Sequence, residues 1–180
     1  MIEAEVHYQL RDFLRKQGQP YWPHHLTLAR LVARALRLGR SALIQAGSSS
    51  VHSGRYRLSY LISILIWPGA AVVVATEAVQ RQLLSDLAYL QDWVPTYKPV
   101  QRGDTWPHPQ FQGLLLTTPE SWLADRLGPR QSFPKDIPTI IDGADDLEQW
   151  VQDQLTVTLT QADWEALALA FPDQQQLIRD

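Results

Sequence analysis

The sequence predicts an α/β fold in which helices cover both faces of a mainly parallel sheet. Buried strands of such sheets are short continuous apolar runs, because both of their faces are covered. Four runs of this kind occur, at Ala42–Ala46, Ala70–Ala75, Gly113–Thr117 and Pro138–Asp142. Segments with apolar residues at helical spacing separate them. This alternation brings the carboxyl ends of the strands to one edge of the sheet, where open α/β sheets bind ligands.

Apolar spacing and end signals define the expected helices. Residues 3–17 place apolar side chains three and four positions apart, and this spacing recurs along the chain. The other expected helices are Leu26–Leu38, Tyr56–Ile66, Glu77–Leu90, a helix opening at Thr118–Pro119–Glu120, Asp145–Leu155 and Gln161–Phe171. Gly39 suits the end of the second helix, because glycine adopts the left-handed conformation found there. Thr118 and Thr160 are expected N-caps, with Pro119 at the first helical position.

Three parts are expected along the chain. Residues 1–20 form an N-terminal helix, residues 21–158 the α/β domain and residues 159–180 a C-terminal helical segment, after which a longer chain is an open question. Residues 91–112 contain four prolines, two tryptophans and little periodicity, which is typical of a long structured loop or a small insertion.

Composition limits the class of protein. The 180 residues are 45% hydrophobic and 19% charged, as in a folded globular protein rather than a disordered one. No apolar run approaches the roughly 20 residues that span a bilayer, so no membrane partner is expected. Glu3 and Glu5 stand where a secretory signal would be apolar, so a cytoplasmic location is expected. The absence of cysteine excludes disulfides, thiolate zinc sites and a cysteine-held iron–sulfur cluster.

Charge is unevenly distributed. Residues 1–60 hold nine Lys/Arg against three Asp/Glu, whereas residues 136–180 hold ten Asp/Glu against one Arg. Arg30, Arg34 and Arg37 form a stripe along the second expected helix. Such a stripe indicates either a solvated helix face or a contact with nucleic acid, and both interpretations stay open.

The segment from Ser41 to Leu65 has the outline of a phosphate-binding loop without its lysine. An apolar run enters a Gly/Ser-rich turn and a helix follows, the order in which loop amides and a helix N-terminus hold an anion. The working pattern has four residues between its glycines and then lysine. Here six residues separate Gly47 from Gly54, and Arg55 follows. The candidate phosphate-binding residues are Gly47, Ser48, Ser49, Ser50, Ser53, Gly54 and Arg55.

Taken together, these segments resemble the first RecA-like motor domain of superfamily 2 DNA helicases of the DinG-like and XPD-like type, with degenerate ATPase motifs. The resemblance covers roughly Tyr21 to Trp150. It rests on Tyr21–Leu26, the loop around Gly47–Gly54, Val72–Glu77, Leu115–Ser121 and Ile140–Glu148. It implies a RecA-like P-loop NTPase fold, with ATP and Mg²⁺ as ligands whose binding is weakened or lost. The family's iron–sulfur module is not expected here.

The resemblance also assigns roles to residues. His24 and His25 stand where the family usually places the glutamine that reads adenine, and surface or capping residues are the alternative. Thr76, Glu77, Thr117 and Thr118 match segments that touch the nucleic-acid backbone in the family, and plain strand–helix junctions are the alternative.

The segment Ile140–Glu148 is similar to the family's Asp-Glu-Ala-His box and carries the strongest implication. Asp142 retains the acid that orients Mg²⁺, with Ser53 as a second candidate metal ligand. Gly143 stands where the family has the catalytic glutamate, and glycine cannot position a water molecule. Asp145 replaces the family's histidine. We expect a site that has lost its hydrolytic base.

The favoured prediction is a helicase-like domain defective in ATP hydrolysis. It would act as a nucleic-acid-associated or protein-interaction module, the N-terminal part of a DNA-helicase-related protein. The expected partners are DNA, single-stranded or at a duplex junction, and a second RecA-like domain or another protein. One alternative is an active ATP-dependent helicase domain rebuilt around Arg55, Ser53 and Asp142. Another is a scaffold that binds no nucleotide.

Overall fold

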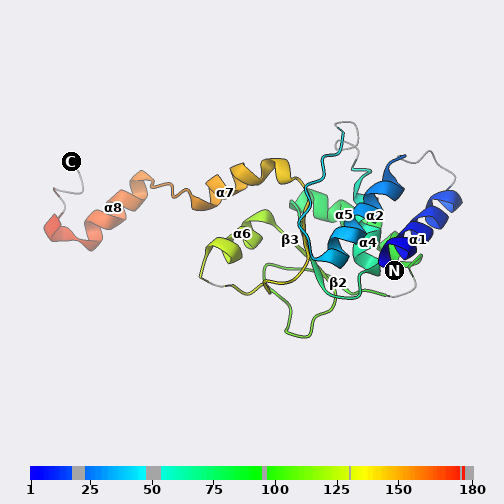
Figure 1. Ribbon diagram of the computed structural model, residues 1–180. Helices are drawn as coiled ribbons and strands as arrows, with labels where there is room; N and C mark the ends of the chain where they lie inside the picture. The colour runs from blue at the N-terminus through cyan, green and yellow to red at the C-terminus, as the bar shows by residue number, and fades with distance from the viewer. Residues whose placement is uncertain (18–22, 48–53, 95–96, 130, 175, 177–180) are drawn as a thin grey trace. The chain divides into compact units, whose positions relative to one another are not determined.

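The computed structural model describes residues 1–17, 23–47, 54–94, 97–129, 131–174 and 176 (Figure 1). It divides into two units, Met1–Asp145 and Asp146–Asp180. The first unit contains the sheet and all the candidate site residues that the structure describes.

The described part of the first unit contains a four-stranded, all-parallel sheet. Its strands are β1 (Ala71–Val74), β2 (Val100–Arg102), β3 (Leu114–Thr117) and β4 (Thr139–Ile141), in the order β2-β3-β1-β4. Every residue of the central strands β1 and β3 is buried, as their continuous apolar sequences predict. The predicted α/β class and parallel sheet are confirmed.

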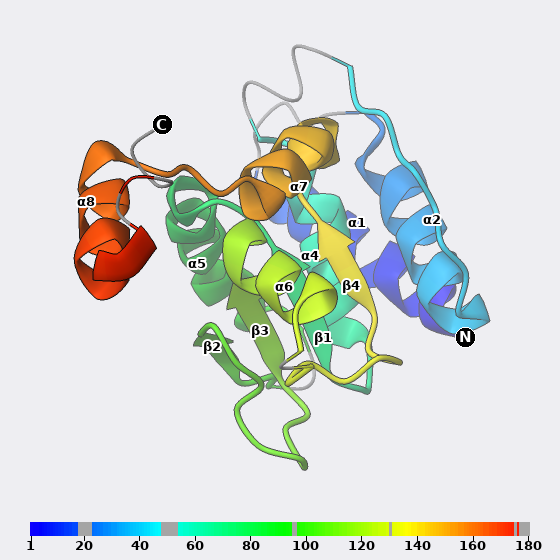
Figure 2. The same cartoon turned by 90° about the vertical axis from the view of Figure 1, so that its left-hand side faces the viewer.

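Four helices lie over one face of the sheet (Figure 2). They are α1 (Ile2–Gln17), α2 (His25–Leu38), α4 (Arg57–Ile66) and α5 (Glu77–Gln91). Strand side chains that alternate along β1 and β3 join their core, among them Ala71, Val73 and Leu116. Helix α2 packs on both α1 and α4, which makes α1 and α2 an outer pair.

The opposite face is covered by α6 (Pro119–Leu127) and the loops beside it. The intervening strand residues Val72, Val74 and Leu115 pack there with Phe111 and Phe133. Helices on both faces are therefore confirmed.

Two sequence expectations are wrong. Ala42–Ala46 is not a buried strand, because it forms no ladder and the Leu43 side chain is 90% exposed. An apolar run becomes a strand only where a neighbouring strand accepts its backbone hydrogen bonds, and β4 bonds only to β1 among the described residues. Conversely, β2 lies inside residues 91–112, which were expected to be a loop or an insertion. Three residues are too few to show strand periodicity.

The predicted helix ends are largely confirmed. Gly39 ends α2 with a left-handed φ of 59°, and Thr118 caps α6 by accepting a hydrogen bond from the Ser121 N–H. The second unit begins at the last residue of a 3-10 turn, η1 (Ala144–Asp146), and continues with α7 (Leu147–Leu155), α8 (Gln161–Ala170) and η2 (Pro172–Gln174). Thr160 forms a capping box at the start of α8, as its position predicts.

Candidate functional site

The carboxyl ends of β1, β3 and β4 meet at one edge of the sheet. Val74 is in register with Thr117 on one side and with Ile141 on the other. Thr76 and Asp142, which follow β1 and β4, therefore reach this edge together. The sequence predicts this convergence, and the structure confirms it.

Asp142 is the centre of a buried polar cluster at this edge. Its backbone N–H donates to the Val74 carbonyl oxygen (2.9 Å), and the residue as a whole is only 6% exposed. Tyr56 Oη donates to Oδ1 of the carboxylate at 2.6 Å. Tyr60 Oη and Arg57 Nε donate to Oδ2 at 2.6 and 3.0 Å. Three donors from one helical turn at the start of α4 thus hold one carboxylate.

The charges in this Asp142 cluster are matched. Burial, together with the hydrogen bond to Asp142, raises the pKa of Tyr56 above its usual range. Burial and the Asp142 charge raise the pKa of Tyr60 in the same direction. Burial opposes the charge of Arg57, but its hydrogen bond and ion pair with Asp142 outweigh burial and raise its pKa. Both tyrosines therefore remain neutral donors, and Arg57 neutralises the carboxylate.

These contacts do not fit the metal-binding role expected of Asp142. A carboxylate offers about four lone-pair positions, and three are already occupied by protein donors. Mg²⁺ requires free oxygen ligands in octahedral geometry. No group of three potential metal-ligating side chains occurs among the residues that the structure describes. Ser53, the second expected ligand, lies outside them.

Gly143 occupies a position that is suited to glycine. Its φ of 87° lies in the left-handed region, where a residue with a side chain is strained. A glutamate at this position would carry that strain. The backbone conformation at position 143 is therefore one that glycine adopts without strain.

The loop residues are only partly described. Gly54 has a φ of 64°, and any side chain there would meet the Arg57 guanidinium. Gly47 and Arg55 are exposed, while Ser48, Ser49 and Ser50 lie outside the described residues. The cation that pairs with Asp142 is Arg57, whereas Arg55 was expected to replace the phosphate-binding lysine. Arg57 and Tyr60 are three positions apart and Tyr56 and Tyr60 four apart, a one-face spacing that the sequence analysis missed.

The two histidines lie at the start of α2. His24 is exposed at the N-cap position. His25 is buried between α2 and α4, where its Nδ1 is hydrogen-bonded to Ser59 Oγ at 2.8 Å. Burial, helped by the Arg55 charge, lowers the pKa of His25 to about 4. The imidazole is therefore neutral, and its Nδ1 is directed into the interface of α2 with α4.

A second polar feature, the strand-end pocket, brings together three of the four expected nucleic-acid residues. It has a volume of about 220 Å³ and is lined by Glu77, Gln80, Arg102, Asp104, Thr117 and Thr118. Thr76, the fourth, is the N-cap of α5. The Oγ1 of Thr117 is buried without a hydrogen-bond partner among the described residues. Arg102 is held in place because its Nε donates to Gln80 Oε1 at 2.9 Å.

The strand-end pocket can therefore offer a hydroxyl, a guanidinium and a helix N-terminus to an anion. Glu77 and Asp104 lie in the same pocket and oppose a negative ligand. The pocket suits a contact within a larger interface better than a tight site for free phosphate.

Comparison with protein families, with curated proteins and with solved structures finds no match to this chain. Across the described residues, every helix is too short or too polar to cross a membrane.

Proposed function

We propose that this chain is a RecA-like, helicase-type domain that does not hydrolyse ATP and that contacts the backbone of a nucleic acid at the carboxyl edge of its sheet. The observation that carries the proposal is the engagement of Asp142 by Tyr56, Arg57 and Tyr60. A motor domain needs that carboxylate to orient Mg²⁺, and here it stabilises the fold instead.

The loss of hydrolysis has two independent supports. The carboxylate is occupied, and the residue after it is a glycine whose φ of 87° disfavours the glutamate that would activate water. A variant that freed the Asp142 carboxylate would still lack the glutamate, and Gly143→Glu would still leave the carboxylate occupied.

The contact with nucleic acid is supported by the strand-end pocket. Thr117 and Arg102 supply donors where the α5 N-terminus also lies. Because phosphate contacts carry little sequence information, the domain would position a nucleic acid rather than read it. A second RecA-like domain or a protein partner would then supply the rest of the interface.

An ATPase assay tests the first half of the proposal. The chain is incubated with ATP, Mg²⁺ and single-stranded DNA, and phosphate release is measured beside the Asp142→Asn variant. We expect no release above the protein-free rate for either protein. Mg²⁺-dependent turnover that is abolished by Asp142→Asn, in a variant still folded by circular dichroism, would overturn the proposal and favour a rebuilt nucleotide site.

DNA binding tests the second half. The anisotropy of a fluorescein-labelled oligothymidylate should rise on addition of the chain, and Arg102→Gln should weaken this binding. Thr117→Val, nearly equal in volume to threonine, should weaken it as well. If both variants bind like the parent chain, the strand-end pocket is not the contact.

A further inference from the structure

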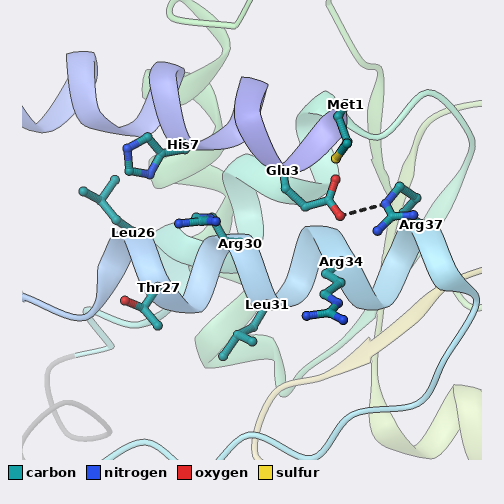
Figure 3. A pocket seen from close by; sticks show the side chains of 9 residues that line it. All are labelled: Met1, Glu3, His7, Leu26, Thr27, Arg30, Leu31, Arg34 and Arg37. Atoms are coloured by element: carbon teal, nitrogen blue, oxygen red, sulfur yellow. Dashed lines mark hydrogen bonds and ion pairs between the residues drawn. The ribbon is translucent and has the colours of Figure 1, made fainter.

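The outer helix pair forms a basic groove that shares no residue with the strand-end pocket. This α1–α2 groove is lined by Met1, by Glu3 and His7 of α1, and by residues of α2 that include Leu26, Arg30, Arg34 and Arg37 (Figure 3). Its volume is about 440 Å³. The arginines lie along α2 at intervals of four and three residues, so they follow one side of the helix.

Two of these arginines are uncompensated. Arg37 Nε pairs with Glu3 Oε1 at 2.7 Å. A backbone hydrogen bond, and after it the bond from Arg37, lowers the pKa of Glu3, so the acid is charged and offsets one arginine only. Arg30 and Arg34 are exposed and form no ion pair with any carboxylate in the described ranges. The groove therefore presents two free positive charges on successive helical turns.

Two polar atoms in the groove also lack partners. His7 Nδ1 and Glu3 Oε2 are buried, yet neither forms a hydrogen bond with the described residues. Buried polar atoms in folded proteins nearly always have a partner, from the protein, from water or from a ligand. Figure 3 shows the His7 ring beside Arg30 and Leu26, on the side of α1 that faces α2. The Glu3 oxygen can only accept hydrogen bonds and opposes an anion, so of these two atoms only the His7 nitrogen can serve a phosphate held by the arginines.

We propose that the α1–α2 groove binds the sugar–phosphate backbone of a single-stranded nucleic acid. The forked guanidinium groups of Arg30 and Arg34 suit phosphate oxygens, which accept two parallel hydrogen bonds. Leu26 and the half-exposed Leu31 border the groove and suit the apolar faces of sugars and bases. The proposal shares the ligand class of the proposed function but not its site.

The composition of the groove favours a nucleic acid over a protein partner. The buried centres of protein–protein interfaces are depleted in charged residues and enriched in aromatic ones. Interfaces with nucleic acids are more polar and much more positive. The groove has three arginines and no Phe, Tyr or Trp among its lining residues.

The test is anisotropy of a labelled oligothymidylate with the full chain, titrated at salt concentrations between about 50 and 200 mM. The variant Arg30→Ala/Arg34→Ala is compared with Arg11→Ala/Arg15→Ala, which removes two exposed arginines of identical spacing from α1 outside the groove. We expect the groove variant to weaken binding at least about tenfold, and the control variant less than about threefold. Each lost phosphate contact should lower the slope of log K against log salt by about 0.7. Both variants change exposed side chains, and circular dichroism checks that they fold.

The outcomes separate the two proposals. A loss with the groove variant but not with Arg102→Gln supports the groove and rejects the strand-end pocket. The reverse pattern overturns the groove and leaves the proposed function intact. Equal losses in the groove and control variants show a general charge effect and overturn the groove. Binding to phosphatidylserine vesicles without binding to oligothymidylate overturns both nucleic-acid proposals.

Discussion

The Asp142 cluster and the α1–α2 groove are both built on arginine, but they use it in opposite ways. At the sheet edge, the Arg57 side chain is only 12% exposed, and its Nε donates to Asp142 while its Nη1 donates to Gln82. In the groove, Arg30 and Arg34 are exposed and unpaired with carboxylates of the described chain. An arginine that is paired and mostly buried therefore stabilises the fold, whereas exposed arginines without a carboxylate partner leave their charge to solvent.

The largest effect is expected from removing the centre of the cluster. Asp142→Ala leaves the Arg57 charge and two tyrosine hydroxyls buried without their acceptor. Breaking a buried ion pair in this way costs about 3–5 kcal/mol of the free energy of unfolding. Urea denaturation followed by circular dichroism measures it. A cost below about 1 kcal/mol would show that the carboxylate does not hold the fold together.

A smaller loss is expected from removing a single donor. Tyr60→Phe deletes one hydroxyl that donates to Asp142 from a residue 5% exposed. Losing a hydrogen bond to a charged group costs about 1.5–3 kcal/mol. Tyr8→Phe, on a residue that is 67% exposed, is the matched control and should be neutral. Thermal unfolding compares the two variants, and equal shifts would contradict the role of Tyr60.

Acid should destabilise the first unit through His25. Burial lowers the pKa of His25 to about 4 in the folded state, against the ordinary 6.5 of an imidazole. Between these values the unfolded chain binds more protons than the folded one, so stability falls as pH falls from about 6.5 to 4. The expected loss is about 1–3 kcal/mol. Urea denaturation across this range measures it, and His25→Gln should flatten the slope relative to the parent chain. An unchanged slope would mean that carboxylates alone cause the acid sensitivity.

The sheet edge could be predicted largely from sequence, because its signals are local. Runs such as Ala70–Ala75 and Gly113–Thr117 are apolar throughout, and parallel strands bring their carboxyl ends together. Thr117 and Glu77 therefore meet as expected. Ala42–Ala46 has the same local signal, yet no described strand pairs with it, and pairing depends on distant residues.

The side-chain contacts of the site depended on details that a linear motif does not contain. The loop pattern points to Arg55, but the helix that starts at Arg57 directs Arg57 and Tyr60 toward Asp142. A shift of two residues along a helix changes the face by about 200°. His25 illustrates the same limit, since its burial depends on the packing of α2 on α4.

The smallest effect is expected from a substitution in the α1–α2 groove. Glu3→Gln removes the charge that offsets Arg37 and gives the groove a third free arginine. Affinity for the oligothymidylate should rise by about threefold at low salt, because the exposed arginines of the groove lose a neighbouring negative charge. Glu5→Gln makes the same change in net charge at an exposed residue outside the groove, and should raise affinity less. If the two variants gain equally, the groove has no privileged contact with the strand and only the net charge of the chain matters.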